Sequence, residues 1–153
     1  FNVYGPRQSP RAVIPSIILQ LLINEDYNIK IGDTSPTRDF TYVGDICSSY
    51  LELLKSENHY GKVINVGMGK EISIGDLITS IRNILGIKDF TLIKESKRYR
   101  PKKSEVNRLF CDNKKLIQNT NWKAKYNLRK GLEITIKWYR ENKSFFKADF
   151  YNI

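Results

Sequence analysis

Apolar residues along this chain recur at two spacings, one typical of helices and one typical of strands. The clearest helical stripe runs along residues 128–141, where Leu132, Ile136 and Tyr139 share one face. Helices are predicted over residues 14–23, 46–56, 113–118 and 128–141, and from a cap at Ser73 or Asp76 to a stop at Gly86. Strands are predicted over residues 1–4, 28–31, 39–43, 63–66, 90–93 and 109–111. This alternation predicts an α/β fold, with Asp45 capping the helix at 46–56.

The length of 153 residues fits one compact domain, and 41% hydrophobic content allows a packed core. The longest apolar stretch, residues 12–23, is too short and too polar to span a bilayer. No secretory signal pattern is visible, and the isolated Cys47 and Cys111 suit a reducing cytoplasm, where we expect the protein to be located. The chain opens at Phe1, inside a motif and without an initiator Met, so we treat it as a possible fragment.

The net charge of +10 is concentrated in one segment. Residues 94–130 hold thirteen Lys or Arg against three acids, while the other residues balance at thirteen against thirteen. Such a segment suggests an anionic partner, which can be a phosphorylated small molecule, a nucleic acid or an acidic surface. A solvated, lysine-rich face is an equally simple interpretation.

No standard catalytic centre can be assembled from these residues. His59 is the sole histidine, which excludes an internal Ser-His-Asp triad and a two-histidine metal site. The chain also contains no Gly-x-Gly-x-x-Gly or Walker loop. We therefore predict no catalytic residue and no metal ligand, and expect the chain not to catalyse a reaction by itself.

Three residues are suited to a diphosphate. Arg38 precedes a predicted strand, Asn65 ends one, and Arg100 stands before the stiffening Pro101. The planar guanidinium fork binds two phosphate oxygens at once and stays charged. Taken singly, Arg38 can instead pair with Asp39 or another acid, Asn65 can serve a turn, and Arg100 can be a solvated charge.

An ordered set of sequence blocks covers nearly the whole chain. Residues 1–8 read Phe-Asn-Val-Tyr-Gly-Pro-Arg-Gln, residues 38–46 read Arg-Asp-Phe-Thr-Tyr-Val-Gly-Asp-Ile, and residues 64–67 read Ile-Asn-Val-Gly. Arg100-Pro101 and a final helix ending in Lys-Trp-Tyr follow. This set resembles the C-terminal, substrate-binding part of an extended short-chain dehydrogenase/reductase of the nucleotide-sugar epimerase/dehydratase family. It is most similar to the 4,6-dehydratases, notably the type acting on GDP-N-acetylglucosamine.

The resemblance implies an α/β fold, the C-terminal half of a Rossmann-type enzyme, with a small mixed sheet and flanking helices. It implies that the matching residues contact a nucleoside diphosphate sugar: Asn2 near the sugar, Val13, Pro15 and Ile31 near the base, Arg38, Asn65 and Arg100 around the diphosphate, and Glu105 at the ribose. Glu105 can equally be a surface carboxylate that balances neighbouring lysines. No coenzyme-binding residue is assigned.

The resemblance implies that the family's glycine-rich coenzyme loop and its catalytic Tyr-x-x-x-Lys pair lie before Phe1. The resemblance therefore implies that NAD or NADP is bound mainly by a preceding N-terminal half, which would also form a homodimer. We expect residues 1–153 to be a single substrate-binding region, with residues of about 40–68 packing on that half. Gly44 replaces a usual acid, which weakens the match slightly.

Two kinds of function remain open at this point. In the first, the chain positions the nucleotide sugar of an NAD(P)-dependent 4,6-dehydratase, or alternatively of an epimerase. In the second, residues 94–130 form a basic nucleic-acid-binding module in which Tyr99, Phe110, Trp122 and Tyr126 stack on bases. The sequence does not choose between dehydratase and epimerase, among GDP, UDP and dTDP, or between NAD and NADP.

Overall fold

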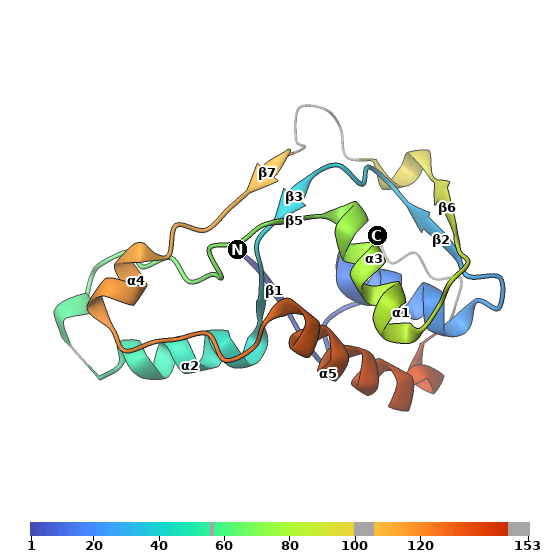
Figure 1. Ribbon diagram of the computed structural model, residues 1–153. Helices are drawn as coiled ribbons and strands as arrows, with labels where there is room; N and C mark the ends of the chain where they lie inside the picture. The colour runs from blue at the N-terminus through green and yellow to red at the C-terminus, as the bar shows by residue number, and fades with distance from the viewer. Residues whose placement is uncertain (56, 100–105, 147–153) are drawn as a thin grey trace.

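The computed structural model describes residues 1–55, 57–99 and 106–146 (Figure 1). The helices are α1 (Val13–Ile23), α2 (Val43–Leu53), α3 (Ile74–Leu85), α4 (Lys114–Asn119) and α5 (Leu128–Glu141), with 3-10 turns η1 (Glu57–His59), η2 (Ser96–Arg98) and η3 (Lys143–Phe145). The strands are β1 (Asn2–Tyr4), β2 (Asn28–Ile31), β3 (Thr37–Arg38), β4 (Phe40–Tyr42), β5 (Ile72–Ser73), β6 (Thr91–Lys94) and β7 (Arg108–Leu109). Among these described residues, no helix is both long and apolar enough to cross a membrane.

The strands form small sheets that are mostly parallel. β1 pairs with β4 and β2 pairs with β6, both in parallel. β3 lies between β5, which is antiparallel to it, and β7, which is parallel. Small mixed sheets with flanking helices confirm the predicted α/β class.

The hydrophobic core lies where α1, α3 and α5 pack around β1, β2 and β4. Ile17, Leu77 and Leu132 are completely buried at its centre. Local capping residues fix the two ends of α3 where the sequence predicts them. The Ser73 hydroxyl accepts the Asp76 amide at 3.0 Å to start α3, and Gly86 ends α3 in a left-handed conformation with φ of 75°.

Two local predictions are wrong. Residues 63–66 form no strand, because no partner strand lies beside them within the described part of the chain. Asp45 does not cap α2, which begins at Val43 directly after β4. Instead, the buried Asp45 carboxylate accepts the backbone amides of Lys125 and Tyr126 at 2.8 and 3.2 Å. It therefore ties α2 to the segment that leads into α5.

Candidate functional site: a cationic pocket beside helix α1

A pocket of about 520 Å³ opens between the start of α1, the strands β1 and β3, and the end of β2. The predicted residues Asn2, Val13, Ile31 and Arg38 all line it. They come from four separate elements, so the fold brings together side chains that are far apart in the sequence. A pocket of this size suits a small-molecule ligand.

The remaining predicted residues are not placed in this pocket. Pro15 is buried within α1 and does not line it, because it faces the core rather than the opening. Asn65 is exposed on the segment before Gly67 and is also not part of the lining. Arg100 and Glu105 lie outside the described residues.

Arg38 is held on a braced strand. Its guanidinium Nη1 donates to the Thr37 carbonyl at 2.8 Å. The Thr37 hydroxyl donates to Glu71 at 2.6 Å, and Arg108 of β7 forms an ion pair with the same carboxylate at 2.6 Å. The hydrogen bond from Arg108, followed by that from Thr37, lowers the pKa of Glu71. Through Glu71, which directly precedes β5, these contacts connect β3 and β7 next to Arg38.

The neighbouring Asp39 carboxylate is fully buried and points toward backbone amides. It accepts the amides of Met68 and Gly69 at 2.9 Å each, and those of Lys70 and Cys111 at 3.3 and 3.4 Å. The carboxylate charge is thus stabilised by a set of N–H donors. Asp39 holds the loop after residue 66 against the strand that carries Arg38.

Cationic residues outnumber acids around the pocket. The lining of the pocket contains five cationic side chains and one carboxylate, that of Asp33. The cations are Arg11, Lys30, Arg38, Lys97 and Arg98. This surplus favours an anionic ligand. The sequence analysis missed Lys97 and Arg98, because nothing in the basic run of residues 94–130 distinguishes them from the other cations there.

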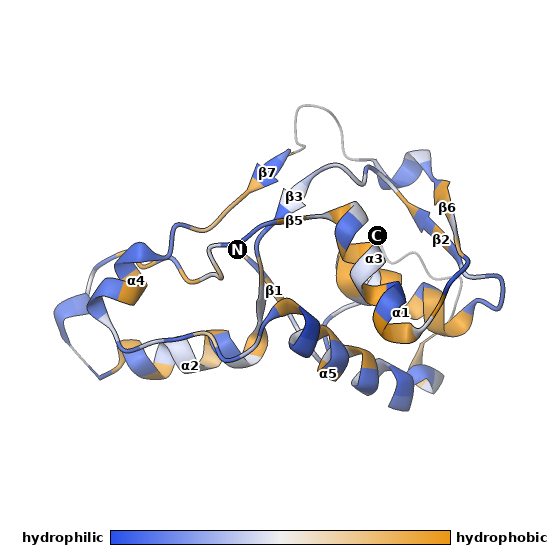
Figure 2. Ribbon diagram, viewed as in Figure 1, coloured by the Kyte–Doolittle hydropathy of each residue, from blue (hydrophilic) through white to orange (hydrophobic). Residues whose placement is uncertain are grey.

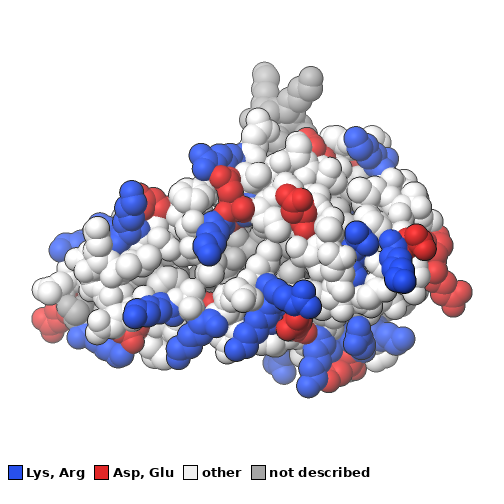
Figure 3. All heavy atoms as spheres, viewed as in Figure 1, with Lys and Arg blue, Asp and Glu red and all other residues white. Residues whose placement is uncertain are grey.

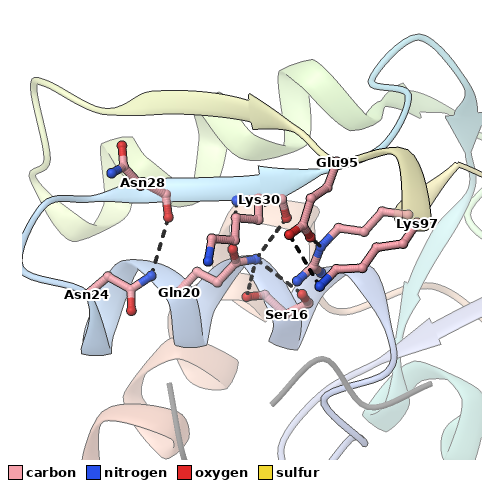
Figure 4. Close-up of polar contacts among 8 residues, drawn as sticks. Ser16, Gln20, Asn24, Asn28, Lys30, Glu95 and Lys97 are labelled. Carbon is pink, nitrogen blue, oxygen red and sulfur yellow. Dashed lines mark hydrogen bonds and ion pairs between the residues drawn. The ribbon is translucent and has the colours of Figure 1, made fainter. Parts of the chain in front are cut away.

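Glu95 sets the arrangement of the two missed cations (Figure 4). Its carboxylate accepts Arg98 Nε at 2.5 Å and lies 3.4 Å from Lys97 Nζ. The Arg98 hydrogen bond is the main reason that the pKa of Glu95 is lowered. The turn also lies against Gly32, where a Cβ would come within 2.4 Å of the Arg98 carbonyl oxygen. Only glycine allows β2 and this turn to approach so closely.

The amide of Gln20 joins α1 to β2 below the pocket (Figure 4). Its Oε1 accepts the Lys30 amide at 2.7 Å, and its Nε2 donates to the Lys30 carbonyl at 3.3 Å. Gln20 Nε2 also donates to the Ser16 carbonyl and hydroxyl. This bridge connects α1 and β2, two of the elements that form the pocket.

The other described cations of the basic segment do not line the pocket. Along α5, Arg129 pairs with Glu133 at 3.0 Å, and Lys and Arg side chains spread over this face with acids between them (Figure 3). Trp122 is buried, its indole Nε1 donating to the Asp45 carbonyl at 3.0 Å, and Tyr126 packs against Tyr42. Because these aromatic rings serve packing, base stacking by the predicted set is not favoured.

Among the described residues, no strand-to-helix connection forms the glycine-rich loop that binds a dinucleotide coenzyme. The connection after β1 contains Pro6 and Arg7 where a glycine-rich loop would be needed. The connection after β4 has no loop at all, since α2 follows at once. The described residues therefore offer no glycine-rich cradle of their own for the diphosphate of NAD or NADP.

Comparison with known proteins places this geometry in a family. A model of the GDP-mannose 4,6 dehydratase family matches residues 1–135. Human dTDP-D-glucose 4,6-dehydratase is 31% identical over 150 residues, which cover 92% of this chain and 40% of the human protein. The predicted family is therefore confirmed: the chain belongs to the extended short-chain dehydrogenases/reductases that comprise the nucleotide-sugar epimerases and dehydratases.

Solved structures agree in fold and are also longer than this chain. UDP-glucuronic acid 4-epimerase from Bacillus cereus, in complex with UDP-glucuronic acid and NAD, is 32% identical with a TM-score of 0.78 over 93% of this chain and 44% of its own. RMD from Pseudomonas aeruginosa, complexed with NADPH, gives 26% identity and a TM-score of 0.82 over 93% of this chain and 47% of its own. The chain thus spans less than half of each of these proteins.

Proposed function

We propose that this chain is the substrate-binding part of an NAD(P)-dependent nucleotide-sugar 4,6-dehydratase and that its pocket binds a nucleoside diphosphate sugar. The observation that carries this proposal is the convergence of Asn2, Val13, Ile31 and Arg38 on one cationic pocket of about 520 Å³. Four residues that match the family's binding motifs meet there under a surplus of positive charge.

In this proposal each part of the pocket contacts a different part of the ligand. Arg38 binds the diphosphate through its planar fork, with Lys97 and Arg98 adding positive charge nearby. Val13 and Ile31 form apolar walls for the base, and Asn2 contacts the sugar. Asn65, Arg100 and Glu105 stay proposed contacts to the diphosphate and ribose, as the resemblance implies.

The contribution of these residues is positioning. Binding the base and diphosphate at a rigid wall holds the sugar in one orientation and so lowers the entropic part of the barrier. The coenzyme chemistry and the proton transfers are assigned to the remainder of a full-length protein, because the described residues form no glycine-rich coenzyme loop. A reducing cytoplasm suits the free Cys47 and Cys111.

Helix α2 supports a contact with that remainder. Tyr50, Leu51 and Leu54 are exposed along or just after α2, and Val63 is 81% exposed. Figure 2 shows several hydrophobic positions along the ribbon of α2. Apolar side chains clustered in this way are typical of a surface that another unit covers. We propose that residues of about 40–68 pack on a dinucleotide-binding half, and that a homodimer forms through that half.

An epimerase is the second candidate. The Bacillus cereus enzyme at 32% identity is a 4-epimerase, and the pocket residues of this chain hold a nucleotide sugar equally well in either reaction. A nucleic-acid-binding module is not favoured, since two of its four predicted aromatic contacts, Trp122 and Tyr126, pack within the fold.

The test is calorimetric titration of the full-length protein with UDP-, dTDP- and GDP-sugars. Removing one charge-assisted hydrogen bond in Arg38→Ala should weaken binding about 10- to 100-fold. The exposed Arg129→Ala on α5 serves as the matched control and should leave binding unchanged. If Arg38→Ala binds every nucleotide sugar as tightly as the unmodified protein, the proposed site is wrong.

A further inference from the structure

Tyr99 lines the pocket but has no role in the site described so far. The lining contains two other aromatic residues, Tyr4 and Phe40, and both are buried in the core. Tyr99 is instead 43% exposed. Among the residues that the structure describes, its ring packs on no other aromatic ring and its hydroxyl forms no hydrogen bond. Tyr99 is therefore the aromatic residue of the lining that has surface left for a ligand.

The backbone of Tyr99 is held beside the end of β2. The Glu95 amide donates to the Ile31 carbonyl at 2.9 Å, which fixes the start of the turn η2 on the strand. The Tyr99 amide then donates to the Ser96 carbonyl at 3.1 Å and closes that turn. A Cβ at Gly32 would lie 3.4 Å from the Tyr99 nitrogen. Tyr99 thus stands next to the point where β2 enters the pocket wall.

The end of β2 is the part of the pocket assigned to the base in the proposed function. Ile31, its apolar residue there, is 8% exposed and offers a base little area. The open side chain of Tyr99 supplies the surface that Ile31 lacks.

An exposed aromatic ring suits one part of a nucleotide sugar better than the others. Every nucleobase has a flat π-face that stacks on an aromatic side chain. A diphosphate gains nothing from such a face, because the face of the ring carries partial negative charge. The sugar is assigned to Asn2 on β1, whereas Tyr99 lies at the end of β2. The base is therefore the part of the ligand that Tyr99 meets.

We infer that Tyr99 binds the base of the nucleotide sugar by stacking on it. This inference rests on the proposed function and adds to it the residue that holds the flat face of the base. It also gives a place to an aromatic residue of the basic segment that does not serve packing. Trp122 and Tyr126 pack within the fold, while Tyr99 keeps an exposed surface in the pocket, where a single base fits.

The experiment compares three forms of the full-length protein: the unmodified protein, Tyr99→Leu and Tyr99→Phe. Each is titrated calorimetrically with UDP, dTDP and GDP and with the corresponding glucose conjugates. Loss of the ring in Tyr99→Leu should weaken binding of the nucleoside diphosphate and of its glucose conjugate alike, by about 5- to 150-fold. Tyr99→Phe keeps the ring and should keep the affinity. Tyr27→Leu is the matched control, because Tyr27 is 40% exposed and does not line this pocket, and it should change neither affinity.

A cross-linking measurement covers the case in which Tyr99→Leu does not fold. The unmodified protein is irradiated with bound 5-iodouridine diphosphate or 8-azidoguanosine diphosphate, according to the base that it binds. Mass spectrometry should then locate the attached nucleotide on Tyr99. Attachment only to residues elsewhere in the protein would overturn the inference.

The titrations separate failure of this inference from failure of the proposed function. Unchanged nucleotide affinity in Tyr99→Leu would overturn the inference alone. A loss confined to the glucose conjugates would assign the ring to the sugar, and equal losses in Tyr99→Leu and Tyr99→Phe would assign the contact to the hydroxyl. Either result would also overturn base stacking and leave the proposed function standing. Failure of the unmodified protein to bind any nucleotide or nucleotide sugar would overturn the proposed function and this inference with it.

Discussion

Helices α1 and α2 have the same length of eleven residues but bury opposite kinds of side chain. The buried residues of α1 are almost all apolar, whereas those of α2 are Asp45 and Ser49. On α2 the apolar side chains are instead exposed, including Leu51 at 64%. The difference shows that α1 completes a core within this chain, while α2 leaves apolar side chains exposed.

The largest expected effect comes from truncating one side chain on each helix. Ile18→Ala removes a fully buried side chain of α1 and should lower the free energy of unfolding by about 2–5 kcal/mol. Leu51→Ala on α2 should change it by less than about 0.5 kcal/mol in this chain, because the side chain is exposed. Urea unfolding of both variants measures the comparison.

The same pair tests the contact proposed for α2. In a full-length protein, Leu51→Ala should become clearly destabilising once another surface covers α2, while Ile18→Ala keeps its effect. Equal and small effects of Leu51→Ala in both settings would show that α2 stays uncovered.

A smaller effect is expected at Asp39, the buried carboxylate beside Arg38. Asp39→Asn replaces an acceptor of backbone amides by a group that also carries a donor, and should cost about 1–3 kcal/mol. The amides of Met68 and Gly69 should then exchange with solvent faster, as measured by hydrogen exchange. Asp89→Asn at an exposed position is the control. Unchanged exchange at both amides would show that Asp39 does not hold the loop.

The smallest effect concerns the two thiols. Burial, followed by the nearby Asp39 charge, raises the pKa of Cys111 to about 11, whereas Cys47 is exposed on α2. At pH 8, iodoacetamide should therefore label Cys47 and leave Cys111 unmodified until the protein unfolds, as read by mass spectrometry. In a full-length protein with α2 covered, Cys47 should be protected as well. Rapid labelling of Cys111 in the folded chain would contradict its burial.

The raised pKa of Cys111 also gives the direction of a pH effect. The unfolded thiol ionises near 9.0 and the folded one near 11, so the neutral form is favoured by folding. Its contribution to stability is full below pH 9 and is lost as the pH rises to 11. Replacement by Ala should remove this part of the alkaline destabilisation.

Sequence periodicity predicted α5 and α3 closely because their core-facing stripes and caps are local features. It failed at residues 63–66, where strand formation depends on a partner absent from the described chain. It also misassigned Asp45, because a cap and a buried acceptor of distant amides look alike in sequence. The local hydrophobic pattern predicts a helix or strand well only where the same residues also determine how that element packs.

The site was predictable in part for a similar reason. Asn2 and Arg38 stand in motifs and were found by resemblance. Arg98 was not, because its place in the pocket lining depends on the close approach of its turn to Gly32, which is distant in the sequence. For a cation within a basic run, the surrounding sequence does not indicate that the side chain lines a pocket.

The parallel pairing of β1 with β4 has a consequence for folding. Asn2 lies opposite Phe40, and the intervening chain contains α1, β2 and β3, so most of the pocket lining belongs to a single crossover. A ligand held by Asn2 and Arg38 spans the two ends of that crossover. Its binding free energy then opposes opening of the crossover directly, by an amount that grows with the logarithm of ligand concentration. Saturating nucleotide sugar should therefore slow exchange of the β1 and β4 amides more than exchange in α4, which stands outside the crossover.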